Sequence, residues 1–177
     1  MSDFLTMAAS LSADQTDRDL PVEQWHPSHC GSMDLVIRAD GSWVHEGTPM
    51  GRPALVRLFS RVLRKDPDGY VLVTPAEKIS IEVEDVPFVV VDLEMDENRD
   101  FWVRTNVGDS VMVGPDHPIA VRSGYGANPL PYVRIRGQLE ARFGRTAYYQ
   151  LVEMASLNDD RLSVESGGTA FDLGAVT

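Results

Sequence analysis

The sequence predicts an α+β protein made of duplicated strand-strand-helix-strand units with antiparallel sheets. Apolar and polar residues alternate from Tyr70 to Val113, which is the pattern of strands. Apolar residues at helical spacing follow Arg52 and again follow Arg145. The order strand, strand, helix, strand therefore occurs twice, and two such units would leave a groove at their junction.

The domain organisation follows from one loop rich in Gly and Pro, residues 114–131, which has the composition of a boundary. We expect an N-terminal helical lead-in over residues 1–24. A first α+β repeat with a central β-meander would occupy residues 25–114. The second α+β repeat would occupy residues 115–177.

In the first repeat, Ala39-Asp40-Gly41 has the chemistry of a hairpin turn. Pro53 suits the first turn of a helix, which we expect to continue to the breaker Asp66-Pro67-Asp68-Gly69. The polar stripe of that helix would expose three arginines to solvent: Arg57, Arg61 and Arg64.

In the second repeat, two strands are expected at 132–136 and 139–143. A helix should follow over residues 145–157. Two further strands, at 162–164 and 170–173, would complete the unit.

Composition limits the class of protein. A chain of 177 residues with 43% hydrophobic content can bury roughly 70% of its unfolded surface, so it does not require disulfides or metal ions to stabilise its core. The single cysteine, Cys30, cannot form an internal disulfide. No apolar run approaches the roughly 20 residues that span a bilayer, and the first residues lack a signal-peptide pattern. We therefore expect a soluble, cytoplasmic protein.

The net charge of −11 repels polyanions, so extended nucleic acid and anionic membrane surfaces are not expected partners. Screening limits this bulk effect to about 8 Å at physiological salt, so a local pair of basic side chains can still bind a small phosphorylated molecule. A small nucleotide-like or phosphorylated ligand stays compatible with the composition.

Two polar clusters bracket the apolar alternation of the middle segment. Arg104 to Asp109 could offer backbone N–H groups and a guanidinium to a phosphate, and Thr74 to Lys78 adds a compact positive charge. The alternative is that both clusters only satisfy turn geometry. The candidate ligand-binding residues are His45, Glu46, Arg52, Thr74, Glu77, Lys78, Arg104, Thr105, Asn106 and Asp109.

Several motifs, in order, resemble an uncharacterised proteobacterial family, domain of unknown function 1285. They are Trp43, His45-Glu-Gly-Thr-Pro-Met-Gly-Arg52, the helix Leu55 to Arg64, Val73-Thr-Pro-Ala-Glu-Lys78, Val83-Glu-Asp-Val-Pro-Phe88, Arg104-Thr-Asn-Val-Gly-Asp109 and Tyr148-Tyr-Gln-Leu-Val-Glu-Met154. The resemblance implies a duplicated core with a C-terminal half superficially like a pleckstrin-homology domain. It also implies that a nucleotide-like ligand binds at the domain junction in signalling.

Together these observations predict a regulatory or signalling protein that binds its ligand at the junction of the repeats, with Lys78 and Arg104 converging there. No catalytic residue and no cofactor is assigned. His26, His29 and Cys30 lack the fourth ligand of a structural zinc site, so no metal is expected.

Two alternative functions stay open. One is a small hydrolase that uses His45 with Glu46, Glu84 or Asp109, and the other is a protein-interaction module in the C-terminal half, with Tyr148 and Tyr149.

Overall fold

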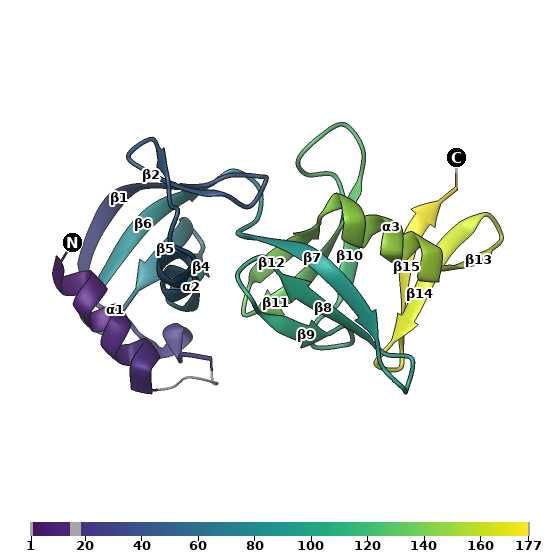
Figure 1. Ribbon diagram of the computed structural model, residues 1–177, viewed down its shortest axis with the longest axis horizontal. Coiled ribbons are helices and arrows are strands. Elements are labelled where there is room, and N and C mark those ends of the chain that lie inside the picture. Colours follow the sequence, from purple (N-terminus) through teal and green to yellow (C-terminus); the bar gives the residue numbers. More distant parts are fainter. Residues whose placement is uncertain (1, 15–18, 177) are drawn as a thin grey trace. The chain divides into compact units, whose positions relative to one another are not determined.

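The computed structural model describes residues 2–14 and 19–176, and these form two compact units. Unit 1 comprises Met1–Arg38 and Ser42–Glu84, and unit 2 comprises Ala39–Gly41 and Asp85–Thr177. Figure 1 shows unit 1 from purple to blue-green and unit 2 from teal to yellow. Each unit has its own six-stranded sheet and its own buried apolar core.

Unit 1 contains one six-stranded sheet in the order β3-β2-β1-β6-β5-β4. Its strands pair antiparallel, except that β1 and β6 run parallel. Its elements are α1 (Ser2–Asp14), η1 (Val22–Gln24), β1 (His29–Ile37), β2 (Trp43–His45), β3 (Thr48–Pro49), α2 (Pro53–Arg61), β4 (Leu63–Asp66), β5 (Gly69–Val73) and β6 (Glu77–Val83).

The core of unit 1 explains why the N-terminal helix belongs to it. Phe4 of α1 is 1% exposed, and its ring centroid lies 6.4 Å from that of Phe59 on α2. Leu35 and Ile37 alternate with more exposed residues on β1 and are fully buried. Helix α1 and the short helix η1 of the expected lead-in therefore belong to the first unit.

The helix predicted from Arg52 ends earlier than expected. It stops at Arg61, and Leu63–Asp66 forms β4, which pairs with β5 through the turn at Pro67 and Asp68. Arg64 was expected to be solvent-exposed, and this was wrong because a strand residue facing a covered side of a sheet is buried. Only 6% of Arg64 is exposed.

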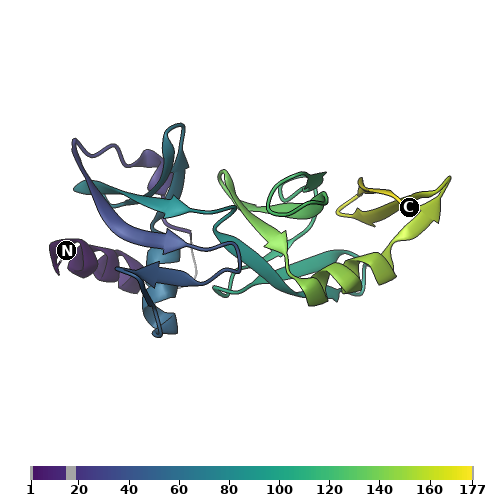
Figure 2. The same ribbon diagram turned by 90° about the horizontal axis from the view of Figure 1, so that it is seen from above.

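Unit 2 contains a second six-stranded sheet, in the order β10-β11-β12-β7-β8-β9, and a C-terminal sheet of three strands. In Figure 2, α3 leads directly into that small sheet. The elements are β7 (Phe88–Met95), β8 (Phe101–Thr105), β9 (Ser110–Met112), β10 (Ile119–Arg122), β11 (Leu130–Arg136), β12 (Leu139–Phe143), α3 (Arg145–Met154), β13 (Ser156–Asn158), β14 (Arg161–Ser166) and β15 (Thr169–Ala175).

The predicted α+β class and duplication are confirmed, and the structure shows what is repeated. Each six-stranded sheet consists of two three-stranded meanders, and the first strand of one meander pairs in parallel with the last strand of the other. These parallel pairs are β1 with β6 and β7 with β12. The helices differ in place, since α2 follows the third strand of its sheet and α3 follows the sixth.

The boundary between the units falls at residues 84 and 85, well before the expected 114 and 115. The reason is strand pairing: β7 leads the meander β7-β8-β9 and also pairs with β12, so residues 85–114 share a sheet with the residues that follow them. The loop rich in Gly and Pro connects strands of one sheet. The meander expected across the middle of the chain is divided between the two units.

The turn of the β1–β2 hairpin, Ala39–Gly41, clusters with unit 2. Asn106 Nδ2 donates to the Gly41 carbonyl at 3.1 Å. Gly41 has φ +87°, and a Cβ there would lie 2.8 Å from Asn106 Nδ2 and 2.9 Å from Val89 Cγ2. Only glycine fits this turn without displacing those groups.

The described helices are short. In residues 2–14 and 19–176, no helix combines the length and apolar character required to cross a bilayer.

Candidate functional site

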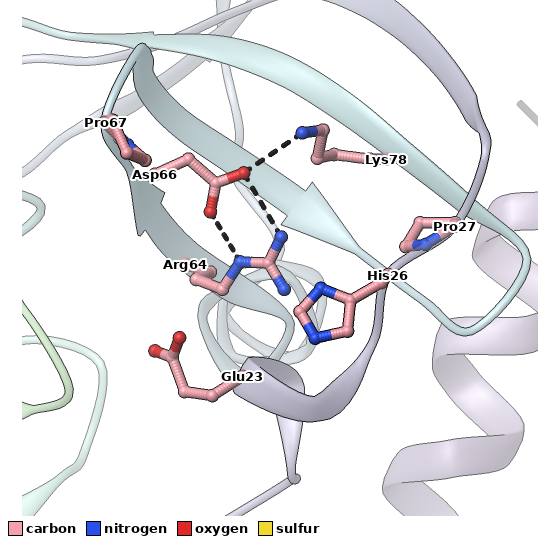
Figure 3. A pocket seen from close by; sticks show the side chains of 7 residues that line it. All are labelled: Glu23, His26, Pro27, Arg64, Asp66, Pro67 and Lys78. Atoms are coloured by element: carbon pink, nitrogen blue, oxygen red, sulfur yellow. Dashed lines mark hydrogen bonds and ion pairs between the residues drawn. The ribbon is translucent and has the colours of Figure 1, made fainter.

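A cavity of about 320 Å³ opens on unit 1 and contains Lys78, one of the predicted ligand-binding residues. Its lining comes from η1 and the segment after it, from β4 and its turn, and from β6, as Figure 3 shows. The lining residues are Glu23, His26, Pro27, Arg64, Asp66, Pro67 and Lys78.

Strand register brings these side chains together. Lys78 lies opposite Val73, and Arg64 lies opposite Val71, so both belong to the same alternating set across β4, β5 and β6. Val71 and Val73 are almost fully buried on this face. The face carries an apolar floor with charged residues at its margin.

Arg64 fastens the N-terminal segment onto this face. Its Nη1 donates to the carbonyls of Val22 at 2.6 Å and Trp25 at 2.8 Å. The same guanidinium makes a two-point contact with Asp66, with Nε–Oδ1 at 2.6 Å and Nη2–Oδ2 at 3.1 Å. Arg64 therefore positions the cavity wall, and its donors are largely engaged.

Asp66 is shared by two cations. Its Oδ2 also accepts a hydrogen bond from Lys78 Nζ at 3.1 Å. The hydrogen bond from Arg64 lowers the pKa of Asp66 below its ordinary value of 3.8, against an opposing effect of burial, and Lys78 lowers it further. The carboxylate is thus ionised at neutral pH, and the three groups together carry one net positive charge.

We expect the acid sensitivity of unfolding to report this carboxylate. Because the pKa of Asp66 is lower in the folded protein than in the unfolded chain, its contacts stabilise the fold above pH 3.8 and are lost as pH falls through the folded pKa. An Asp66→Asn variant should lose less stability than the parent chain between about pH 5 and about pH 2. Urea unfolding at several pH values measures this, and equal pH slopes would contradict the assignment.

Lys78 is the basic group best placed to contact a ligand. Its side chain is 30% exposed, and among the described residues its ammonium contacts only the Asp66 carboxylate. Two of its three N–H groups are therefore available to the cavity. Glu23 and His26 are exposed at the rim. The arrangement can bind an anionic group beside an imidazole.

The other residues of the first predicted cluster stabilise a turn. Thr74 is fully buried, and its Oγ1 accepts hydrogen bonds from the backbone N–H groups of Ala76 at 3.3 Å and Glu77 at 3.2 Å. Glu77 Oε2 lies 3.8 Å from His29 Nε2. Neither Thr74 nor Glu77 lines the cavity, although both lie within four residues of Lys78.

The second cluster also builds a turn. Thr105 is buried, and its Oγ1 accepts from the Asp109 N–H at 3.1 Å. Asn106 holds two segments of unit 2, since its Oδ1 accepts from the Val89 N–H at 3.0 Å while its Nδ2 donates to Gly41. The side chains of Thr105 and Asn106 are thus engaged in hydrogen bonds within unit 2, and their role in ligand binding stays a prediction.

Arg104 and Asp109 each form an ion pair within unit 2. Arg104 Nη2 lies 2.8 Å from Asp92 Oδ2, and Arg136 Nη1 lies 2.8 Å from Asp109 Oδ2. The expected convergence of Lys78 with Arg104 joins residues of two units and stays a prediction.

The remaining predicted residues lie near β2 and α2. His45 is half-buried at the end of β2, and Glu46 is exposed with φ +48° in the turn that follows. Arg52 is the exposed N-cap residue of α2, and its carbonyl accepts from Leu55 and Val56. None of the three lines the cavity, and the hydrolase interpretation built on His45 stays a prediction.

Sequence reasoning missed Glu23, Arg64 and Asp66 as site residues and weighed His26 only as a metal ligand. Asp66-Pro67-Asp68-Gly69 between two apolar runs is also a hairpin signal, and that interpretation would have placed Arg64 and Asp66 on a strand beside β5. No local sequence pattern indicates that Glu23 and His26 lie beside Arg64, Asp66 and Lys78. Within the described part of the chain, no group of three or more His, Cys, Asp or Glu could hold a metal ion.

Comparison with known proteins agrees with the two-unit division. Residues 20–86 match the family described as "Domain of unknown function (DUF1285), N-terminal domain", and residues 87–173 match "Protein of unknown function (DUF1285), C-terminal domain". No curated protein matches the chain.

Two crystal structures of DUF1285 family proteins are similar. The one from Silicibacter pomeroyi DSS-3, at 2.50 Å resolution, is 37% identical, with a TM-score of 0.87 over 98% of this chain and 95% of that chain. The one from Shewanella baltica OS155, at 1.40 Å, is 28% identical, with a TM-score of 0.55 over 68% of this chain and 91% of that chain. The family models together cover most of the sequence and the first structure covers nearly all of it, so this chain belongs to the DUF1285 family.

Proposed function

We propose that the protein is a ligand-binding regulatory protein whose ligand is a small phosphorylated, nucleotide-like molecule, bound in the cavity of unit 1. The observation that carries the proposal is the Lys78 ammonium, which has two unused donors beside a cavity of about 320 Å³. That volume falls at the lower end of the range for small-molecule sites, about 300–1,000 Å³.

Local charge supports an anionic ligand. Arg64 and Lys78 share the carboxylate of Asp66, so these three groups carry one net positive charge beside the Glu23 carboxylate of the rim, within a chain of net charge −11. The guanidinium is locked by four hydrogen bonds, so it adds a fixed positive field while Lys78 makes the contact. A phosphate oxygen beside Lys78 would gain charge-assisted hydrogen bonds.

The same cavity has groups that suit the remainder of a nucleotide-like ligand. His26, Pro27 and Pro67 present ring surfaces to it, and Glu23 offers a carboxylate to hydroxyl or amino donors. A ligand that contacts both His26 and Lys78 joins the N-terminal segment to β6. Occupancy would then stabilise the packing of that segment, which provides a physical route to regulation.

Calorimetry and thermal unfolding with AMP, ADP, ATP, cyclic AMP and inorganic pyrophosphate test the proposal. At least one should bind and raise the unfolding midpoint. Lys78→Gln should weaken that binding by about tenfold or more, because a hydrogen bond to a charged group contributes about 1.5–3 kcal/mol.

The sequence contains a matched control, since Lys65 is its other lysine. Lys65 Nζ lies 5.3 Å from the Tyr70 ring centroid and does not line the cavity. Lys65→Gln removes the same charge and should leave the affinity unchanged. Equal weakening by both substitutions, or no binding of any of the five compounds, would overturn the proposal.

A further inference from the structure

A second, smaller cavity lies on the exposed face of β7, β8 and β9 in unit 2. Its volume is about 130 Å³, and its lining residues are Asp92, Glu94, Trp102, Val103, Arg104 and Ser110. This volume is well below the roughly 300 Å³ at which small-molecule sites begin. It suits the head group of one side chain.

Trp102 is a large aromatic residue that the sheet displays to solvent. Alternation along β8 buries Phe101, Val103 and Thr105, and it leaves Trp102 40% exposed. The indole Nε1 donates to Asp96 Oδ2 at 3.1 Å, and that interaction lowers the pKa of Asp96. Asp96 in turn accepts the N–H groups of Asn98 and Asp100, so the ring is held by an ordered turn.

Glu94 lies directly opposite Trp102 on the neighbouring strand. Directly opposed residues in an antiparallel pair have Cβ atoms about 4.5–5.5 Å apart. The side chains of Glu94 and Trp102 therefore line the same small cavity. Among the described residues the Glu94 carboxylate has no hydrogen-bond or ion-pair partner. The nearby Arg104 is paired with Asp92 instead.

We infer that this face binds an arginine side chain of a protein partner, with the guanidinium stacked on Trp102 and paired with Glu94. A guanidinium is the cation that both stacks on indole and hydrogen-bonds a carboxylate in one geometry. The Trp102 ring is already held in place by Asp96 before the partner binds, which lowers the entropic cost of binding. The net charge of −11 would speed association with a basic partner.

NMR spectroscopy of the full chain tests this inference with a blocked pentapeptide that carries one arginine between glycines. The three tryptophans produce three indole N–H signals, and the Trp102 signal is identified by its loss in Trp102→Leu. Titration should shift that signal and leave those of Trp25 and Trp43 in place. A peptide with neutral citrulline in place of arginine has nearly the same shape and should shift none.

A matched pair of charge substitutions separates a specific site from general attraction. Glu94→Gln should weaken binding about tenfold. Glu97→Gln removes the same charge from an exposed residue outside the cavity and should leave binding unchanged. The inference is overturned by equal effects of both substitutions, by equal binding of the citrulline peptide, or by an unmoved Trp102 signal. The nucleotide experiment concerns a different unit, so each proposal can fail alone.

Discussion

Replacing Arg142 with methionine is expected to lower the free energy of unfolding by about 3–5 kcal/mol. Arg142 lies on β12, and its side chain is 13% exposed. Its Nη1 lies 3.7 Å from Asp85 Oδ2, and its Nη2 donates to the Ala39 carbonyl. The substitution leaves a carboxylate that is only 8% exposed without its cation. Urea unfolding followed by circular dichroism measures the change.

The second partner of Asp85 cannot replace that cation. Tyr132 is fully buried and donates its hydroxyl to the Asp85 carboxylate, with both oxygens at 3.1 Å. Burial raises the pKa of Tyr132, and the charge of Asp85 raises it further, so the hydroxyl stays a neutral donor. A neutral hydrogen bond alone offsets less of the desolvation of an ionised carboxylate than the ion pair does.

Arg134 is the matched control for this prediction. It is exposed on β11, and Arg134→Met should change stability by less than about 0.5 kcal/mol. In the double variant Arg142→Met with Asp85→Leu, part of the loss should be recovered, since no unpaired charge remains. Equal small effects of Arg142→Met and Arg134→Met would show that the Asp85 contact is energetically unimportant.

Replacing Arg64 with methionine is expected to cost a similar amount, about 3–5 kcal/mol. The substitution removes the cation closest to Asp66 and leaves the carbonyls of Val22 and Trp25 without their buried donor. It should also release the segment around η1 from the sheet. Urea unfolding measures the stability, and amide hydrogen exchange of residues 22–26 measures the local release.

Arg61 is the matched control for Arg64. It is the last residue of α2, is partly exposed and does not line the cavity. Arg61→Met should leave the amide hydrogen exchange of residues 22–26 near that of the parent chain. If Arg64→Met lowers stability without faster exchange in this segment, then Arg64 stabilises β4 and does not fasten η1.

Much of the local structure could be predicted from the sequence because short-range chemistry specifies it. The alternation from Phe88 to Met95 and from Phe101 to Thr105 produced β7 and β8, and Arg145 does begin α3. The Ala39-Asp40-Gly41 turn also formed. In these segments side-chain period and turn residues act within a few positions of one another.

The candidate site was only partly predictable for the same physical reason. Lys78 was identified because its cluster stands out from the apolar alternation around it. Its partner Asp66 was interpreted as part of a helix stop, since Leu55 to Leu63 has helical spacing throughout. A short apolar segment is compatible with either a helix or a strand. The segment with which it pairs in the folded protein decides which of the two it forms.

The sequence by itself determined the α+β class, most strands, the helices that begin at Pro53 and Arg145, and the acidic character of the chain. Only the tertiary structure decided the parallel pairs β1 with β6 and β7 with β12, the boundary at residues 84 and 85, and the burial of Arg64. Those features join residues far apart along the chain. The stability of these long-range contacts comes from burial and hydrogen bonding between distant segments, which the local periodicity of the sequence does not encode.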